Sequence, residues 1–262
     1  MAAPEPDPAL DALQQALWAA RNEHRFIATA QCPALPQSVA DAYAVADWLH
    51  RQRGGTVAGW KLGATSARAQ TFLGLSQPFL GRIYADLVTA ASCELRHYGG
   101  ELALEAEFGL RLGRDLGPDD LVNSTNLFAA VDAIVPLIEI NRPSYLEPFV
   151  VGALAIVADN GVNAGMVVGE PQTRFSLEQL AAAHVTVTLN GAQAGAGCFA
   201  DTAENWIEQL AWAAVFLAGR GCPLRAGQVI AMGSCAGTQV VRPGDQLVAD
   251  FGPWGELRVS IR

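Results

Sequence analysis

Two glutamates with a two-residue spacing, Glu105 and Glu107, are the first residues in this sequence that suggest chemistry. They lie in the segment Leu102–Leu112, LALEAEFGLRL, whose alternation of apolar residues predicts a β-strand. Side chains at positions i and i+2 of a strand point the same way, so the two carboxylates lie side by side. Such neighbours fit either a solvated strand face or a hard divalent cation, Mg²⁺ or Mn²⁺. The spacing alone leaves both interpretations open.

A third carboxylate, Glu139, lies within a run of residues that is otherwise apolar. The segment Ile134–Ile140, IVPLIEI, predicts a buried strand. A buried carboxylate without a partner is strongly unfavourable, because it loses its hydration. Glu139 therefore needs a cation, a hydrogen-bond donor or a metal ion beside it, and it is the third carboxylate that the first strand lacks.

Lys61 is the only lysine among 17 basic residues. It lies in a predicted strand and turn over residues 56–66, between Trp60 and Leu62. Arginine does not release its proton at any working pH, whereas a lysine in a desolvated site can. The single lysine therefore predicts a half-buried amine with a task that arginine cannot perform, although one lysine can also persist by chance.

The composition indicates one large core. The chain has 262 residues, of which 51% are hydrophobic and 16% charged. Its formal net charge of −9, with no basic stripe, argues against a nucleic-acid partner. No signal peptide is evident and the longest apolar runs are about half a membrane span. We therefore expect a soluble, cytoplasmic protein with no membrane partner, whose five cysteines are reduced.

The elements that would position these groups follow from local patterns. We expect an α-helical N-terminal segment over 1–54 and a β-rich catalytic domain over 55–262. In the first, one helix begins at Asp7 or Asp11 and a second, capped by Ser38, runs from Val39 to about Arg53. Further helices are expected over 147–159 and 204–220, and strands over 164–169, 185–189, 228–234, 238–252 and 256–261. Glycine loops of the nucleotide-binding types do not occur, so a nucleotide cofactor has no support.

Seven collinear motifs resemble the fumarylacetoacetate hydrolase superfamily, in particular its 2-keto-4-pentenoate hydratase and 4-oxalocrotonate decarboxylase branch. They are GWKLGATS (59–66), GLSQPFLGRIYADL (74–87), LEAEFGLRLGRDL (104–116), PLIEI (136–140), VADN (157–160), LRAGQVIAMGS (224–234) and RPGD (242–245). The resemblance implies an α+β fold, a mixed β-roll of packed, curved sheets with an α-helical N-terminal segment. It also implies a homo-oligomer.

The same resemblance assigns roles to individual residues. It implies Mg²⁺ or Mn²⁺ bound by Glu105, Glu107 and Glu139, and a catalytic role for Lys61. The substrate contacts that it implies are Leu62, Gly63 and the turn at Gly233-Ser234, in particular Ser234. A lysine that is buried near a dication is expected to have a lowered pKa, as proton transfer requires.

The activity implied by the resemblance is that of a metal-dependent lyase acting on small 2-oxo or 2-hydroxydienoic acids. The first interpretation is a 2-keto-4-pentenoate hydratase in aromatic-compound degradation, which adds water after ketonisation. The alternatives are a 4-oxalocrotonate decarboxylase, an acylpyruvate C–C hydrolase that would use a dyad of Glu23 and His24, and an inactive assembly partner.

Three departures from the family pattern concern the substrate and leave the metal ligands and the lysine intact. Ser144 replaces a usual arginine, Ala155 replaces a usual aspartate, and a usual His-Pro pair is absent near Asn205-Trp206. The sequence leaves open whether Arg142 supplies the missing positive charge.

Overall fold

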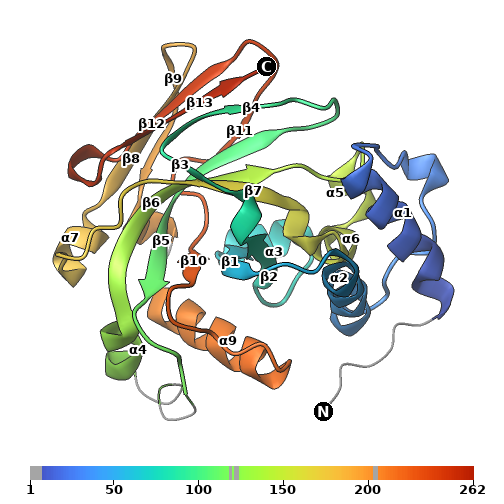
Figure 1. Ribbon diagram of the computed structural model, residues 1–262, viewed down its shortest axis with the longest axis horizontal. Coiled ribbons are helices and arrows are strands. Elements are labelled where there is room, and N and C mark those ends of the chain that lie inside the picture. The colour runs from blue at the N-terminus through green and yellow to red at the C-terminus, as the bar shows by residue number, and fades with distance from the viewer. Residues whose placement is uncertain (1–7, 118–119, 121–123, 203–205) are drawn as a thin grey trace.

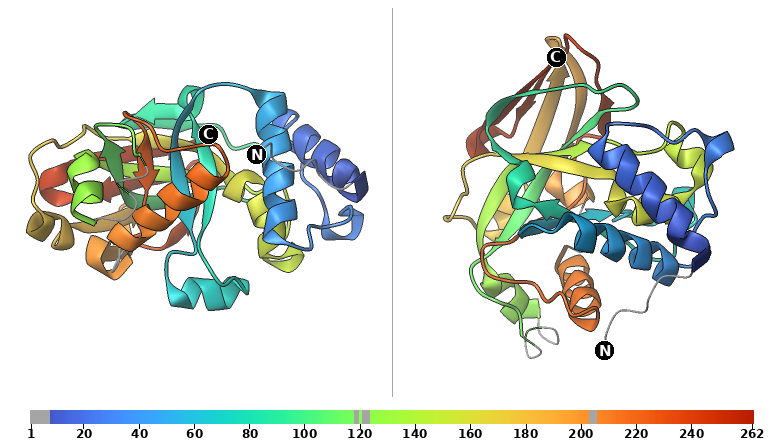
Figure 2. Two further views of the ribbon diagram at one scale, coloured as in Figure 1. Left: turned by 90° about the horizontal axis from the view of Figure 1, so that it is seen from below. Right: turned by 45° about the vertical axis from the view of Figure 1, so that its right-hand side comes forward.

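The computed structural model describes residues 8–117, 120, 124–202 and 206–262. Its strands form two curved sheets, and the N-terminal helices lie at the opposite end of the molecule from the second sheet (Figures 1 and 2). The described α-helices are α1 (Asp11–Asn22), α2 (Val39–Arg53), α3 (Ala67–Leu73), α4 (Ser124–Ala130), α5 (Pro148–Val151), α6 (Ala153–Ala158), α7 (Leu177–Ala181), α8 (Phe199–Thr202) and α9 (Trp206–Gly219). Among them, none has both the length and the apolar character needed to cross a membrane.

The larger sheet carries the segments that contain the predicted chemistry. Its strands are β1 (Val57–Gly63), β2 (Phe79–Tyr84), β3 (Val88–Ala90), β5 (Ala103–Leu112), β6 (Val131–Asn141), β7 (Asn163–Val168), β10 (Val229–Ala231) and β11 (Thr238–Val240). Within the described residues, their order is β2-β1-β10-β5-β6-β7-β3, with β11 paired to β5. The β1–β10 and β3–β7 pairs are parallel and the others antiparallel, so the sheet is mixed.

The second sheet packs against the larger one and closes the core. Its strands are β4 (Ser92–Leu95), β8 (His184–Leu189), β9 (Ala192–Cys198), β12 (Gln246–Asp250) and β13 (Glu256–Ile261), in the order β4-β13-β12-β8-β9. Asn190 and Gly191 join β8 to β9 with φ of 53° and 80°, and positive φ at both residues is typical of a two-residue hairpin turn. Two mixed, curved sheets with helices outside them confirm the expected β-roll.

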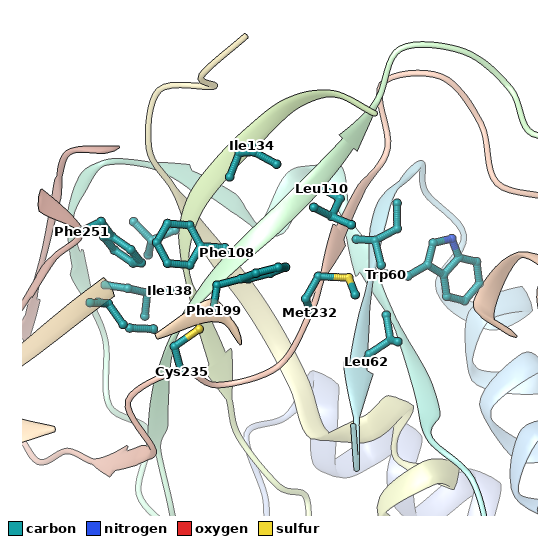
Figure 3. Close-up of a cluster of buried hydrophobic side chains, with 14 of the residues drawn as sticks. Trp60, Leu62, Phe108, Leu110, Ile134, Ile138, Phe199, Met232, Cys235 and Phe251 are labelled. Atoms are coloured by element: carbon teal, nitrogen blue, oxygen red, sulfur yellow. The ribbon is translucent and has the colours of Figure 1, made fainter. Parts of the chain in front are cut away.

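The alternation in β5 places one row of side chains in the core between the sheets. Phe108 is fully buried, and its ring contacts the rings of Phe199, Phe251 and Trp254 at centroid distances of 6.0, 5.2 and 5.9 Å (Figure 3). Leu110, on the same face, joins this cluster. The opposite face of β5 is thereby free to carry the glutamates.

The N-terminal segment shares a core with residues from later in the chain. Leu13 and Leu17 of α1 and Val45 of α2 are fully buried in one cluster with Tyr145 and Ile156. Packing of α2 on α6 brings the segment against the larger sheet (Figure 1). The boundary between 1–54 and 55–262 remains a prediction, since the two parts meet in this common cluster.

Several predicted helix limits differ from the structure. The Ser38 Oγ accepts a hydrogen bond from the Asp41 N–H at 3.1 Å, which confirms the cap of α2. Asp11 is the first residue of α1, which confirms one of the two predicted starts, and Asp7 lies outside the described residues. The helix expected over 147–159 is two helices, because Gly152, with φ of 92° and ψ of 166°, breaks it. The first two residues of the helix expected over 204–220 lie outside the described residues. The structure describes this helix, α9, from Trp206 onward.

The core around Phe108 should dominate the stability of the fold. Replacement of this buried ring by alanine leaves a cavity, so we expect Phe108→Ala to lower the free energy of unfolding by about 3–5 kcal/mol. Phe72, which is 72% exposed, provides the matched control, and Phe72→Ala should change it by less than about 0.5 kcal/mol. Urea denaturation followed by tryptophan fluorescence measures both. Equal losses in the two variants would contradict this assignment of the core.

Candidate functional site

The pairing of β5 with β6 brings three glutamates together. The two strands are antiparallel, and their register sets Glu139 directly opposite Glu105. Glu107 follows two residues after Glu105 and therefore points to the same side of the sheet. One carboxylate oxygen from each of the three lies within 4.8 Å of the others. The structure thus brings the three predicted metal ligands into one cluster.

The glutamate face of the sheet is closed to solvent over most of its area. Glu107 and Glu139 are each 1% exposed, and Glu105 is half-buried. Lys61 from β1 and Asn163 from β7 contact Glu139 directly. The interpretation of this face as a solvated strand face is therefore wrong, because neighbouring strands close over it.

The carboxylates of Glu105 and Glu107 have different hydrogen-bond partners. Glu105 Oε2 accepts a hydrogen bond from the Asn141 side-chain amide at 2.9 Å, and its Oε1 accepts one from the Thr238 hydroxyl. Glu107 Oε2 accepts a hydrogen bond from the Gly233 backbone N–H at 2.8 Å. The other oxygen of Glu107 is buried and has no hydrogen-bond partner among the described residues. A buried carboxylate oxygen without a donor is strongly unfavourable unless a cation meets it.

Lys61 completes the cluster and is held tightly. Its Nζ lies 3.2 Å from Glu139 Oε1 and 3.4 Å from Oε2, and the side chain is 6% exposed. The aliphatic stem passes close to the backbone of two glycines. A Cβ added at Gly161 would lie 2.9 Å from Lys61 Cε, and one at Gly81 would lie 3.2 Å from its Cγ. Larger residues at these positions would therefore crowd the lysine side chain. The amine itself is fully buried, not half-buried as predicted.

The protein's own charges set the direction of each pKa shift in the cluster. Burial, followed by the charges of Glu139 and Glu105, raises the pKa of Glu107 well above its usual range. Burial also raises the pKa of Glu139, although Lys61 opposes this. Burial lowers the pKa of Lys61, but the three carboxylates together outweigh it and leave that pKa raised. The expected lowering of the Lys61 pKa assumed a dication among the carboxylates. For the protein's own groups alone, the direction is the opposite.

The donor set fits a hard divalent cation. The cluster found in the described part of the chain offers three carboxylates and contains no histidine or cysteine. All-oxygen ligands of this kind suit Mg²⁺ or Mn²⁺ and disfavour zinc. The unpartnered buried oxygen of Glu107 is the clearest sign of fit, since a cation would supply the charge that no described donor provides.

A cavity with two lobes opens beside the cluster, and Lys61, Gly63, Ala64 and Glu105 line both lobes. The polar lobe, of about 270 Å³, is also lined by Leu62, Thr65, Ser66, Ala69, Glu107, Asp201, Gly233 and Ser234. The apolar lobe, of about 180 Å³, is also lined by Leu73, Phe79, Glu101, Ala103, Asn141, Pro143, Pro148, Phe149, Ile156, Val162 and Thr238. The predicted substrate-contact residues Leu62, Gly63 and Ser234 thus all line the polar lobe, and their contact with substrate remains a prediction.

Three residues that hold the glutamates were not predicted from the sequence. They are Asn141, Asn163 and Thr238. Asn141 carried a usable signal, because it follows Glu139 by two residues in the same strand and so shares its face. Asn163 and Thr238 carried none, since only the pairing of β7 and β11 with the central strands brings them to the cluster.

The proposed Glu23 and His24 dyad lies away from the cavity. Glu23 forms an exposed ion pair with Arg25 at 2.8 Å, and the His24 ring stacks on Tyr98 at a centroid distance of 3.5 Å. Neither residue lines either lobe. The geometry therefore gives no support to a hydrolase that uses this pair.

Two of the three departures from the family pattern also lie away from the carboxylates, and Asn205 of the third lies outside the described residues. Ser144 is fully buried, and its hydroxyl donates to Asp159 at 2.8 Å. Ala155 is a buried residue of α6. Arg142 lines a separate cavity of about 420 Å³ together with Trp18, and it lines neither lobe beside the glutamates. Arg142 therefore does not bring a positive charge to this cavity.

Comparison with known proteins places the chain among relatives of one family. Residues 71–262 match the family described as fumarylacetoacetate (FAA) hydrolase C-terminal. A 2-hydroxyhexa-2,4-dienoate hydratase from Comamonas testosteroni is 31% identical over 88% of this chain and 89% of its own length. A 2-keto-4-pentenoate hydratase from Paraburkholderia xenovorans is 27% identical over 94% of this chain and 93% of its own length.

A solved structure shares the fold over nearly the whole chain. It is a 4-oxalocrotonate decarboxylase from Pseudomonas putida G7, complexed with magnesium and adipate, with a TM-score of 0.83 and 24% identity. The alignment covers 96% of each chain. The family match, the hydratase relatives and this shared fold agree with the motifs of the sequence. The chain belongs to the fumarylacetoacetate hydrolase family.

Proposed function

We propose that this protein is a divalent-metal-dependent hydratase of small 2-hydroxydienoic acids. The observation that carries the proposal is the convergence of three glutamates, two of them fully buried, with the single lysine, next to a cavity that Lys61, Glu105 and Glu107 line. The hydratases among its relatives align over most of the chain, which supports the same class of reaction here. An inactive assembly partner would gain nothing from a buried cluster of like charges, since such a cluster destabilises the fold unless a cation binds it.

The glutamates are suited to hold the cation. Glu105, Glu107 and Glu139 would bind Mg²⁺ or Mn²⁺ through one oxygen each. Hydrogen bonds to both oxygens of Glu105 and to Oε2 of Glu107 hold these two carboxylates in orientation. When bound, such a cation supplies Lewis-acid stabilisation of negative charge on the oxygen of a 2-oxo or 2-hydroxy acid. The three carboxylates neutralise the charge of the cation and leave the open side of the cavity to the substrate.

Lys61 is placed to carry the proton between substrate carbons. Lys61 lines both the polar and the apolar lobe, so we expect a substrate that spans the two lobes to pass beside its amine. Water has little access there, because the lysine is 5% exposed. Once a dication offsets the carboxylates, burial becomes the deciding influence on the pKa of Lys61 and favours the neutral amine. A neutral buried amine can accept a proton from the substrate and return it at another carbon.

The lining of the cavity favours a substrate with one carboxylate and an apolar tail. Lys61 is the only basic residue among the described residues that line the two lobes. The apolar lobe is lined by apolar residues, among them Phe79, Phe149, Ile156 and Val162, together with the carboxylates of Glu101 and Glu105 and the polar side chains of Asn141 and Thr238. A second carboxylate in that lobe would lose hydration without meeting a cation. The proposal therefore favours a hydratase of monocarboxylates over a decarboxylase of the dicarboxylate 4-oxalocrotonate.

The homo-oligomer and the cytoplasmic location remain predictions. Apolar residues on the outer face of α9 could mark a contact between subunits. Two of them are already engaged within the chain, because Trp212 stacks on Phe216 at a centroid distance of 5.1 Å and Phe216 contacts Tyr43. Val215, on the same helix, is 53% exposed. The expectation of an oligomer therefore rests on the family resemblance more than on this helix.

We expect one Mg²⁺ or Mn²⁺ ion per chain, with Glu107 as a ligand. Glu107→Gln removes one ligand and one buried charge, so Mn²⁺ affinity should fall by at least about 10-fold. The same change should raise the thermal midpoint of the metal-stripped protein, because a buried charge without a partner is lost. Titration calorimetry and melting in chelator measure the two effects. The control is Glu170→Gln, at an exposed position; unchanged affinity in Glu107→Gln would remove this residue from the ligand set.

The substrate prediction is tested by comparing one and two carboxylates. With Mg²⁺, kcat/KM should be at least about 10-fold higher for 2-hydroxypenta-2,4-dienoate and 2-hydroxyhexa-2,4-dienoate than for 4-oxalocrotonate, because each unpaired buried charge is unfavourable. Ultraviolet absorbance follows all three compounds. Phe149→Arg, at a 62% exposed position of the apolar lobe, should improve turnover of the dicarboxylate, whereas Phe149→Leu should not. A wild-type preference for 4-oxalocrotonate would favour the decarboxylase, and turnover of acetylpyruvate alone would favour the hydrolase.

Lys61→Arg separates proton transfer from binding. Arginine keeps the positive charge but does not release its proton, so turnover should fall by at least about 100-fold while Mn²⁺ affinity changes little. Exchange of the substrate's C3 protons in D₂O, followed by NMR, isolates the proton-transfer step from hydration. Circular dichroism checks that the larger side chain leaves the fold intact. Near-normal exchange in Lys61→Arg would exclude the lysine as the proton carrier.

A further inference from the structure

Asn163 holds the glutamate that lies beside the catalytic lysine. Its side-chain amide donates to Glu139 Oε1 at 2.9 Å and lies 3.3 Å from the Gly165 carbonyl oxygen. Asn163 is 2% exposed, so water does not compete for these contacts. The pairing of β6 with β7 shifts register between Ile140 and Asn141, where Asn141 faces Asn163. Such irregularities re-aim a side chain, and here the asparagine is aimed at the carboxylate.

Arg21 of α1 holds the backbone of the same asparagine. Its Nη1 donates to the Asn163 carbonyl oxygen at 3.0 Å, and its Nε donates to Asp159 Oδ1 at 2.8 Å. Its Nη2 donates to the Asp159 carbonyl oxygen. One guanidinium therefore contacts both ends of the short segment 159–163, which leads directly into β7.

Asp159 links this arrangement to the segment that follows β6. It is fully buried, and its two carboxylate oxygens accept hydrogen bonds from the Ser144 hydroxyl and the Ser144 backbone N–H, each at 2.8 Å. The chain leaving the strand of Glu139 and the chain entering the strand of Asn163 are thus tied to one carboxylate, and Arg21 pairs with that carboxylate. The N-terminal helix is thereby joined to the segment that leaves β6, the strand of Glu139, and to the start of β7, the strand of Asn163.

We propose that Asn163 is a positioning residue for Glu139, and that Arg21 acts through Asn163 to make the N-terminal helix part of the metal site. The inference rests on the proposed metal-dependent function. The Asn163 amide occupies one oxygen of Glu139 from the β7 side, so rotation of the carboxylate away from its two partner glutamates would break that bond. Outer hydrogen-bond partners of this kind orient metal ligands and tune their affinity.

A purely structural role for Arg21 is the alternative, because its partly buried ion pair would also support the fold. Arg220 offers a matched control for that role. Its side chain is 23% exposed, as is that of Arg21, and it pairs with Asp47, whose side chain is 11% exposed. Asp47 lines neither lobe of the cavity, so loss of Arg220 removes a comparable ion pair without touching the proposed route to Glu139.

The experiment compares Mn²⁺ affinity of the full chain by titration calorimetry, at a temperature where circular dichroism shows every variant folded. Asn163→Leu should weaken binding by about 10–100-fold, the scale of such outer partners. Arg21→Met should weaken it less, yet clearly more than Arg220→Met, which should lower the thermal midpoint and leave affinity unchanged. The double variant should bind no more weakly than Asn163→Leu alone, since Arg21 acts through Asn163.

The outcomes separate this inference from the proposed function. If the parent protein binds Mn²⁺ and Asn163→Leu binds it equally well, the positioning role is overturned while the metal site stands. If Arg21→Met and Arg220→Met have equal affinity, the role of the helix is overturned. If the parent itself binds no Mn²⁺, the proposed function fails first. Should Asn163→Leu not fold, Asn163→Ala removes the donor without adding bulk and decides the question by the same titration.

Discussion

The structure is organised around the burial of three carboxylates against a single ammonium group. Glu105, Glu107 and Glu139 lie together where Lys61 is the only nearby cation among the described groups that contact them. Such an excess of buried negative charge is unfavourable, so hydrogen-bond donors from the surrounding strands and loops converge on the cluster. The donors still leave one oxygen of Glu107 without a partner. The site is therefore built to be completed by a divalent cation, and its affinity for one derives from this incomplete compensation.

The core behind the sheet is what allows this burial. Because side chains alternate along β5, the strand that presents Glu107 to the cavity presents Phe108 to the aromatic cluster between the two sheets (Figure 3). The stabilising apolar contacts and the destabilising charges are thus separated by the thickness of one strand. A register slip of one residue would exchange the two faces, so the same packing that stabilises the fold also fixes the position of the proposed metal ligands.

The sequence was informative wherever a local pattern carried the chemistry. The spacing of Glu105 and Glu107, and a glutamate inside an apolar run, were enough to predict the cluster. The contacts of Asn163 and Arg21 were not predictable, because they depend on pairing between segments that are 142 residues apart. The break at Gly152 was missed because the apolar pattern continues through it. The raised pKa that Lys61 has beside the glutamates alone was not predicted, because it depends on the balance of all neighbouring charges, which no single motif contains. The lowered pKa that is expected beside a dication stays a prediction.

The missing arginine at position 144 shows how strand geometry restricts the substrate. β6 ends at Asn141, whose side chain donates to Glu105 on the metal side, whereas Arg142 lines the cavity that contains Trp18. The guanidinium of Arg142 is therefore on the other side of the chain from the glutamates, and Arg21 and Ser144 satisfy Asp159 instead. Among the described lining residues, Lys61 is the only basic residue, whereas Glu101 adds a carboxylate to the apolar lobe. The proposed preference for a monocarboxylate rests on this lack of a second cation and on the repulsion that Glu101 would exert on a second carboxylate.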